Sequence, residues 1–174
     1  MLNDSKSHTT KEIFQEYLRL KKVIEKGDKN CITDILRVIN TTNREMYQTI
    51  TPREYFKNPY LSLDKLLQDF DEMIFYVFKC QSLIVGVVAL EVENMDFGKI
   101  HSLYVLPEYQ KKGIGTALVT HLQNVAQDLG IRKLKLHVGE LAVWAINFYR
   151  KLGYVNIDML ERTWGITVVM EKEL

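Results

Sequence analysis

The chain has 174 residues, of which 47% are hydrophobic and 26% charged, and its formal net charge is +1. This profile predicts one soluble globular domain, and the near-neutral charge argues against binding to nucleic acid or to an anionic membrane surface. No apolar run approaches the roughly 20 residues of a membrane span. The two cysteines, Cys31 and Cys80, lack metal-ligand spacing and are too few for a disulfide framework, so we expect a reduced, cytoplasmic protein without a bound metal.

The N-terminal part of the sequence leaves one structural choice open. We expect residues 1–11 to form a flexible tail and residues 12–174 to form a single domain. Apolar residues between 13 and 24 recur at helical spacing, yet residues 18–24 also suit a short strand. Further on, helical patterns are predicted around Ile32–Ile39, from Pro52 and over Leu63–Phe70.

From residue 73 onward, strands and helices alternate. The pattern predicts a hairpin of two strands, a third strand closed by Pro107, and then a helix, a strand, a helix and two final strands. These elements are expected over 74–79, 83–93, 100–106, 116–126, 134–138, 142–151, 154–159 and 166–172. This order predicts an α/β protein whose mixed sheet has helices on both faces.

The most informative stretch is Gln110-Lys111-Lys112-Gly113-Ile114-Gly115, between the third strand and the following helix. A Gly-rich turn that leads into a helix directs unpaired backbone N–H groups at one spot, which predicts an anion site. A Walker loop does not fit these residues. A dinucleotide-binding fingerprint does not fit either, because Leu118 stands where that pattern needs a third glycine.

A different pattern fits. Leu103-x-Val105-x-Pro107-x-x-Gln110-x-x-Gly113-x-Gly115 is similar to the acetyl-CoA signature of the GNAT (Gcn5-related) N-acetyltransferase superfamily, and Ala145–Tyr154 resembles a later helix of that family. The resemblance implies a mixed, mostly antiparallel sheet of about 6–7 strands, splayed between two parallel strands. It also favours a strand over a helix for residues 18–24, because the family opens with a strand.

The resemblance assigns roles residue by residue. It implies that acetyl-CoA binds with its pantetheine arm against the strand around Leu103, Tyr104 and Val105. The pyrophosphate is expected on the N–H groups of Gln110, Lys111, Lys112, Gly113, Ile114, Gly115 and Thr116. Tyr149 matches the general acid that protonates the departing thiolate. Ala142 departs from the family, which often has a cofactor-binding Asn there.

Deprotonation of the attacking amine requires a base. His101 is the first candidate, because it is expected to share a strand face with Leu103 and Val105 and because imidazole titrates near neutral pH. Glu91 and Glu93 are the alternatives. Aromatic side chains that could line an amine pocket by cation–π contact are Tyr47, Tyr55, Phe56, Tyr60 and Trp164.

The expected function is therefore acetyl transfer from acetyl-CoA to a primary amine, with a small amine or polyamine as acceptor. A protein N-terminus or lysine is the alternative acceptor, and the oligomeric state stays open, a homodimer included. Two other classes of protein compete with this interpretation: a non-catalytic acyl-CoA sensor and a regulatory domain that binds nucleotide or phosphate.

Overall fold

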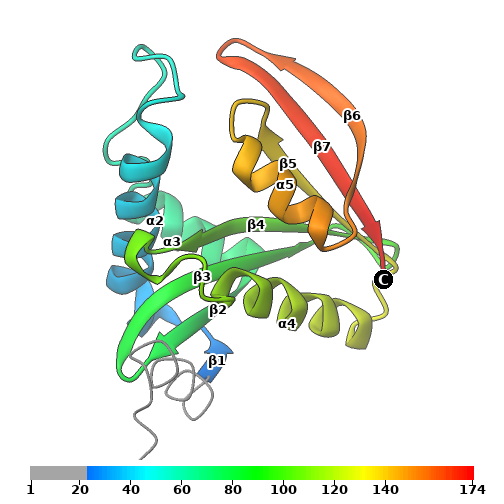
Figure 1. Ribbon diagram of the computed structural model, residues 1–174. Coiled ribbons are helices and arrows are strands. Elements are labelled where there is room, and N and C mark those ends of the chain that lie inside the picture. The colour runs from blue at the N-terminus through cyan, green and yellow to red at the C-terminus, as the bar shows by residue number, and fades with distance from the viewer. Residues whose placement is uncertain (1–22) are drawn as a thin grey trace, which may run out of the picture.

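The computed structural model describes residues 23–174, so the expected tail and the open choice for residues 12–22 lie outside the described residues. One sheet of seven strands runs through the molecule in the order β1-β2-β3-β4-β5-β7-β6 (Figure 1). The strands are β1 (Val23–Lys26), β2 (Met73–Cys80), β3 (Leu83–Val92), β4 (Phe97–Val105), β5 (Lys133–Gly139), β6 (Val155–Arg162) and β7 (Gly165–Glu173).

All neighbouring strands are antiparallel except β4 and β5, which are parallel. The predicted fold class, a mostly antiparallel mixed sheet with one parallel pair, is therefore confirmed. Residues 23 and 24 belong to β1, as the strand alternative required.

Four α-helices cover the sheet in the described part of the chain. Helices α2 (Ile32–Tyr47) and α3 (Leu63–Glu72) lie on one face, and α4 (Ile114–Asp128) and α5 (Val143–Lys151) on the other (Figure 1). Two 3-10 helices, η1 (Lys29–Cys31) and η2 (Pro107–Tyr109), precede α2 and α4. No helix within residues 23–174 is both long enough and apolar enough to cross a membrane.

Close packing of α4 on β3 holds the functional region in place. A Cβ built on Gly86 of β3 would lie 3.0 Å from Leu118 and 3.2 Å from Ile114, both on α4. Because those contacts are too short for most side chains, the absence of one at Gly86 lets the helix rest directly on the strand. The first turn of α4 is thereby fixed against the end of β4.

The predicted helix at Pro52 is wrong. The segment forms a turn, in which the N–H groups of Tyr55 and Phe56 both donate to the carbonyl of Pro52. A second proline at position 59 disfavours helical geometry at Asn58. The long connection between α2 and α3 therefore stays irregular, and it lies at the same end of the molecule as the β6–β7 turn (Figure 1).

Candidate active site

The parallel pair β4 and β5 separates after three residues. Backbone pairing runs only from Phe97 opposite Lys133 to Lys99 opposite Lys135. Both strands continue, but β4 stays paired with β3 on its other side and β5 with β7. We call the separated segments, 100–105 of β4 and 136–139 of β5, the splay. The facing backbone groups of the splay are not paired with each other.

A β-bulge in β4 accompanies the splay. His101 lies opposite Ala89 and Tyr104 opposite Val87, so two residues of β4, Ser102 and Leu103, face the single residue Val88. Ser102 has a φ of +51°, in the left-handed region that few non-glycine residues adopt. A bulge of this kind bends its strand and strengthens the local twist, which directs the end of β4 away from β5.

The bulge overturns one expectation about His101. His101 and Tyr104 share the sheet face of Ala89 and Val87, whereas Val105 lies opposite Gly86 and therefore on the other face. The predicted common face of His101 and Val105 is wrong, because an extra residue in a strand inverts the alternation of side chains beyond it.

Polar side chains fix the end of β4. The Val105 carbonyl accepts hydrogen bonds from Nε2 of Gln110 (2.9 Å) and Oγ1 of Thr42 on α2 (3.3 Å). The N–H of Leu106 donates to the Val85 carbonyl of β3. Because successive residues of a strand point their backbone groups to opposite edges, the N–H of Val105 faces the splay. Gln110 therefore positions the strand as well as the loop that follows.

The Gly-rich loop opens α4 without a side-chain cap. Gly113 is the N-cap residue, with a φ of +83°, and a Cβ built there would have no atom within 4 Å. The first N–H groups of a helix have no partner inside the helix. Those of Ile114, Gly115 and Thr116 therefore face open space beside the splay, at the positive end of the α4 dipole.

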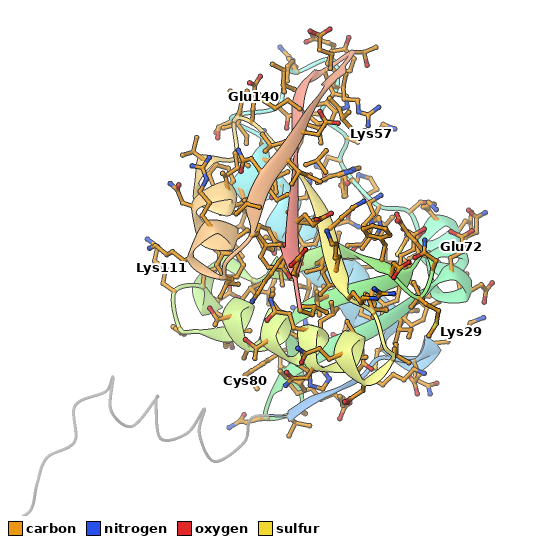
Figure 2. The ribbon with its side chains drawn as sticks, turned by 90° about the vertical axis from the view of Figure 1, so that its right-hand side faces the viewer. Lys29, Lys57, Glu72, Cys80, Lys111 and Glu140 are labelled. Carbon is orange, nitrogen blue, oxygen red and sulfur yellow. The ribbon has the colours of Figure 1, made fainter. Side chains whose placement is uncertain are left out.

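The remaining loop residues are used differently. The N–H of Gln110 donates to Pro107, which removes it from the set of unpaired donors. Lys112 donates through Nζ to the Glu108 carbonyl at 2.7 Å and lies over the Tyr109 ring. Lys111 adopts a φ of +57°, and Figure 2 shows it at the rim of the side that carries α4 and α5. Gly115 packs instead: a Cβ there would lie 3.4 Å from the Phe148 ring of α5.

Tyr149 of α5 is buried between the rings of Phe148 and Tyr154, at centroid distances of 5.1 and 5.5 Å. Burial, with smaller contributions from Tyr47 and Tyr154, raises the pKa of Tyr149 well above its ordinary value. Its hydroxyl has no hydrogen-bond partner within residues 23–174. The phenol is therefore neutral, and the described residues leave its donor unused.

Two of the three candidate bases form one unit. Nε2 of His101 lies 2.7 Å from Oε2 of Glu91 on the neighbouring strand, and both side chains are partly exposed. Glu93 lies directly after β3 and acts electrostatically on His137 of β5. A carboxylate that is hydrogen-bonded to an imidazole orients the ring and stabilises its protonated form.

His137 joins this group from the other side of the splay, and sequence reasoning missed it. Burial lowers the pKa of His137, with further lowering by Lys99, Arg162 and His101 and an opposing effect of Glu93. These groups come from β4, β5, β6 and the turn after β3, so only the strand order brings them together. No local motif around His137 indicated that it would lie beside the candidate bases. Across residues 23–174 no group of three or more His, Cys, Asp or Glu side chains could hold a metal ion.

Four aromatic rings meet above the end of β4. Tyr47 of α2 lies 6.5 Å from Tyr104 of β4 and 5.6 Å from Trp144 of α5, and Tyr60 lies 6.4 Å from Tyr104. We call Tyr47, Tyr60, Tyr104 and Trp144 the aromatic cluster. Of the five aromatic residues expected near the acceptor, only Tyr47 and Tyr60 belong to it. Trp164 lies against Gly139 instead, and Tyr55 makes no ring contact within residues 23–174.

Ala142, the departure from the expected pattern, is the buried N-cap of α5 and makes no capping hydrogen bond through its side chain. Its carbonyl instead accepts the N–H groups of Ala145 and Ile146. Ala142 therefore begins α5 through its backbone carbonyl.

Comparisons with known proteins agree with this architecture. Residues 34–154 match the model of the acetyltransferase (GNAT) family, whose enzymes use acetyl-CoA. The chain therefore belongs to the GNAT family.

The chain is also similar to proteins named as N-acetyltransferases. An uncharacterized N-acetyltransferase of Methanocaldococcus jannaschii is 34% identical over 103 residues, which cover 56% of this chain and 46% of that protein. A second one from the same organism is 31% identical over 134 residues, covering 74% and 82%. The probable N-acetyltransferase san of Drosophila melanogaster is 32% identical over 84 residues, covering 46% of each chain. The chain thus spans about half the length of several relatives that it matches.

A solved structure shares the fold. The PaiA N-acetyltransferase of Thermoplasma acidophilum, in complex with coenzyme A, superposes with a TM-score of 0.79 at 22% identity, covering 88% of this chain and 99% of that one.

Proposed function

We propose that this protein transfers the acetyl group of acetyl-CoA to a primary amine by direct attack of the amine on the thioester. The observation that carries this proposal is the juxtaposition of three features: an uncapped helix N-terminus at Gly113, the splay beside it, and the unpartnered hydroxyl of Tyr149. Together they offer an anion site, unpaired strand edges and a proton donor.

The chain's own groups fit the donor substrate. The N–H groups of Ile114, Gly115 and Thr116 are positioned to bind the pyrophosphate, and the Val105 N–H and the edge around Leu103 and Tyr104 to bind the pantetheine amides. Bound acetyl-CoA would supply the activated thioester. No amide side chain is available at position 142, so we expect backbone groups to provide most of the polar contacts with the arm.

Tyr149 acts at the leaving group. Its raised pKa keeps the phenol protonated at every pH at which such an enzyme works. A thiol has a pKa of about 8.5, so complete proton transfer from Tyr149 to the thiolate is unfavourable. The main contribution of Tyr149 is therefore a hydrogen bond that stabilises negative charge as it develops on sulfur.

His101 and Glu91 act at the amine. We propose that His101 accepts the proton of the attacking amine through water and that Glu91 holds the imidazole and offsets its positive charge. Glu93 remains the second carboxylate of the site and acts through His137.

The test is an acetyl-transfer assay that follows free thiol and acetylated amine together, in wild type and in the variants Tyr149→Phe and His101→Gln. Turnover with at least one amine and a marked fall of its rate in both variants would support the proposal. Binding of coenzyme A without turnover of any amine would instead indicate a sensor. Tight binding of ATP without binding of coenzyme A would indicate a nucleotide-binding domain.

A further inference from the structure

We infer that the acceptor is a primary amine with a large apolar or aromatic group next to the reacting nitrogen, and that this group binds on the aromatic cluster. The inference rests on the proposed function and narrows its acceptor. It disfavours polyamines, which the sequence alone left as a leading choice.

The first reason is the position of the aromatic cluster. Its rings come from α2, the connection after it, β4 and α5, and they converge where β4 ends. Tyr104 is one residue from Val105, whose N–H faces the splay, and Tyr47 is close enough to Tyr149 to affect the pKa of that phenol. A group bound on the cluster would therefore lie beside the proposed proton donor.

The second reason is exposure. Tyr60 is 50% exposed and Trp144 41% exposed, whereas Tyr47 and Tyr104 lie partly buried against them. Leu141 and Val143, which precede Trp144, are each 56% exposed. Large apolar side chains that gather on a surface commonly mark a binding site. Aromatic rings offer such a surface at low cost in side-chain entropy.

The third reason is charge. Burial raises the pKa of Tyr47, and it raises that of Tyr104 well above the ordinary value, so both phenols stay neutral. In the described part of the chain, the neighbouring side chains that shift the pKa of Tyr47 and Tyr104 are Tyr60, Tyr47 and Asn43, and none is a carboxylate. The nearby Glu45 is paired with Arg44 at 3.6 Å.

The connection after α2 adds to the charge argument. A hollow of about 530 Å³ begins at Gln48, directly after Tyr47 in the chain, and its other lining residues are Thr51, Arg53 and Phe56. Its one charged lining residue is therefore a cation. A polyamine would bring several ammonium groups to this region, and each would need a carboxylate to offset its desolvation. An apolar amine would bring one ammonium group, and apolar surroundings favour its neutral, nucleophilic form.

Two sources share this chemistry: a free arylalkylamine and the N-terminal residue of a peptide. The experiment compares kcat/KM for phenethylamine, for spermidine, for a peptide with N-terminal Met, for the same peptide with N-terminal Ser, and for a peptide whose only amine is a lysine side chain. We expect phenethylamine or the Met peptide to exceed its polar counterpart by about tenfold to a hundredfold, as burial of one large apolar side chain implies. Which of the two is better identifies the source.

Variants test the binding surface itself. Trp144→Ala and Tyr60→Ala should each lower kcat/KM for the preferred apolar amine by about fivefold to thirtyfold and leave the KM for acetyl-CoA unchanged. Tyr55→Ala is the matched control, because Tyr55 is a 42%-exposed tyrosine of the same connection without a ring contact in residues 23–174. Tyr55→Ala should change neither the kcat/KM for the apolar amine nor the KM for acetyl-CoA. Binding of coenzyme A by each variant verifies that it is folded.

A preference for spermidine or for the lysine peptide would overturn the inference and leave the proposed function intact. An equal loss for polar and apolar amines in Trp144→Ala would also overturn it. Failure of wild type to acetylate any of the five amines would count against the proposed function itself.

Discussion

The two ends of the candidate site are built in different ways. The donor end, around Gly113, is made of backbone groups supplied by one continuous segment, and its key features are a positive φ and an uncapped helix. The acceptor end is made of side chains from four separate segments, which meet only because Tyr47 of α2 and Trp144 of α5, from opposite faces of the sheet, come together near the end of β4. A local motif therefore encodes the donor end, and long-range packing encodes the acceptor end.

Removal of the proposed base should have the largest effect. We expect His101→Gln to lower kcat/KM by about a hundredfold or more, in line with the usual contribution of a general base, while the affinity for coenzyme A stays the same. Glu91→Gln should cause a smaller loss, because the imidazole remains. Steady-state kinetics with the amine concentration varied, at saturating acetyl-CoA, would measure both effects.

The control for that prediction is His121→Gln on α4, outside the site. Equal losses in the His101 and His121 variants would show that the effect is structural rather than chemical. An unchanged rate in His101→Gln would remove His101 from the mechanism and leave Glu91 or Glu93 as the base.

Removal of the Tyr149 hydroxyl should have the next largest effect. Tyr149→Phe keeps the ring packed between Phe148 and Tyr154 but loses the donor to the departing sulfur. We expect kcat to fall by about tenfold to a hundredfold, which corresponds to one hydrogen bond to a charged group. A thioester with a more acidic thiol should restore part of the rate. A packing defect would not respond to that change.

A methyl group at Gly113 should weaken the donor end by about tenfold, because it places an atom where the structure leaves open space for an anion. Calorimetric titration of Gly113→Ala with coenzyme A would measure this. Gly130→Ala is the matched control, because Gly130 follows the same helix and has a φ of +80° against +83°. Both variants should lose similar stability, about 1 kcal/mol. Only Gly113→Ala should lose affinity for coenzyme A.

The smallest effect concerns the helix that supports the donor end. His121 packs edge-on against Tyr76 at 4.6 Å, its buried Nε2 has no partner within residues 23–174, and burial lowers its pKa. In the unfolded chain His121 takes up a proton near pH 6.5, whereas in the folded protein it does so only at lower pH.

Stability should accordingly fall as the pH drops below about 6.5, and it should not change from this source above pH 7.5. Thermal unfolding of wild type and His121→Phe at pH 7.5 and 5.5 would test this. An identical acid-induced decrease of Tm in both proteins would contradict the assignment.

The contrast between the two ends also explains what the sequence could predict. The α/β class, most element positions and the Gly-rich loop followed from local patterns, because strands and helices have short periods and Gly and Pro mark the turns between them. The mostly antiparallel sheet with its splayed parallel pair followed from the family resemblance. The irregular path after Pro52 did not, because a proline permits a helix start without requiring one.

Within the site, the sequence suggested His101 and Glu91 as separate candidates. Their hydrogen bond depends on the β3–β4 register. The sheet face of His101 relative to Val105 depends on a bulge at Ser102, and no glycine in the sequence indicated that bulge. Trp144 and His137 were missed for the same reason: their neighbours come from distant segments of the chain. Thr42, which holds Val105 from α2, likewise gave no signal in the sequence.

One measurement tests the central claim most directly: mass spectrometry and free-thiol detection on the same reaction of wild-type protein, acetyl-CoA and an apolar primary amine. The account predicts one acetylated amine for every molecule of coenzyme A released, with the rate reduced by Tyr149→Phe. Thiol release without acetylated amine, or no release with any amine while coenzyme A binds, would contradict it.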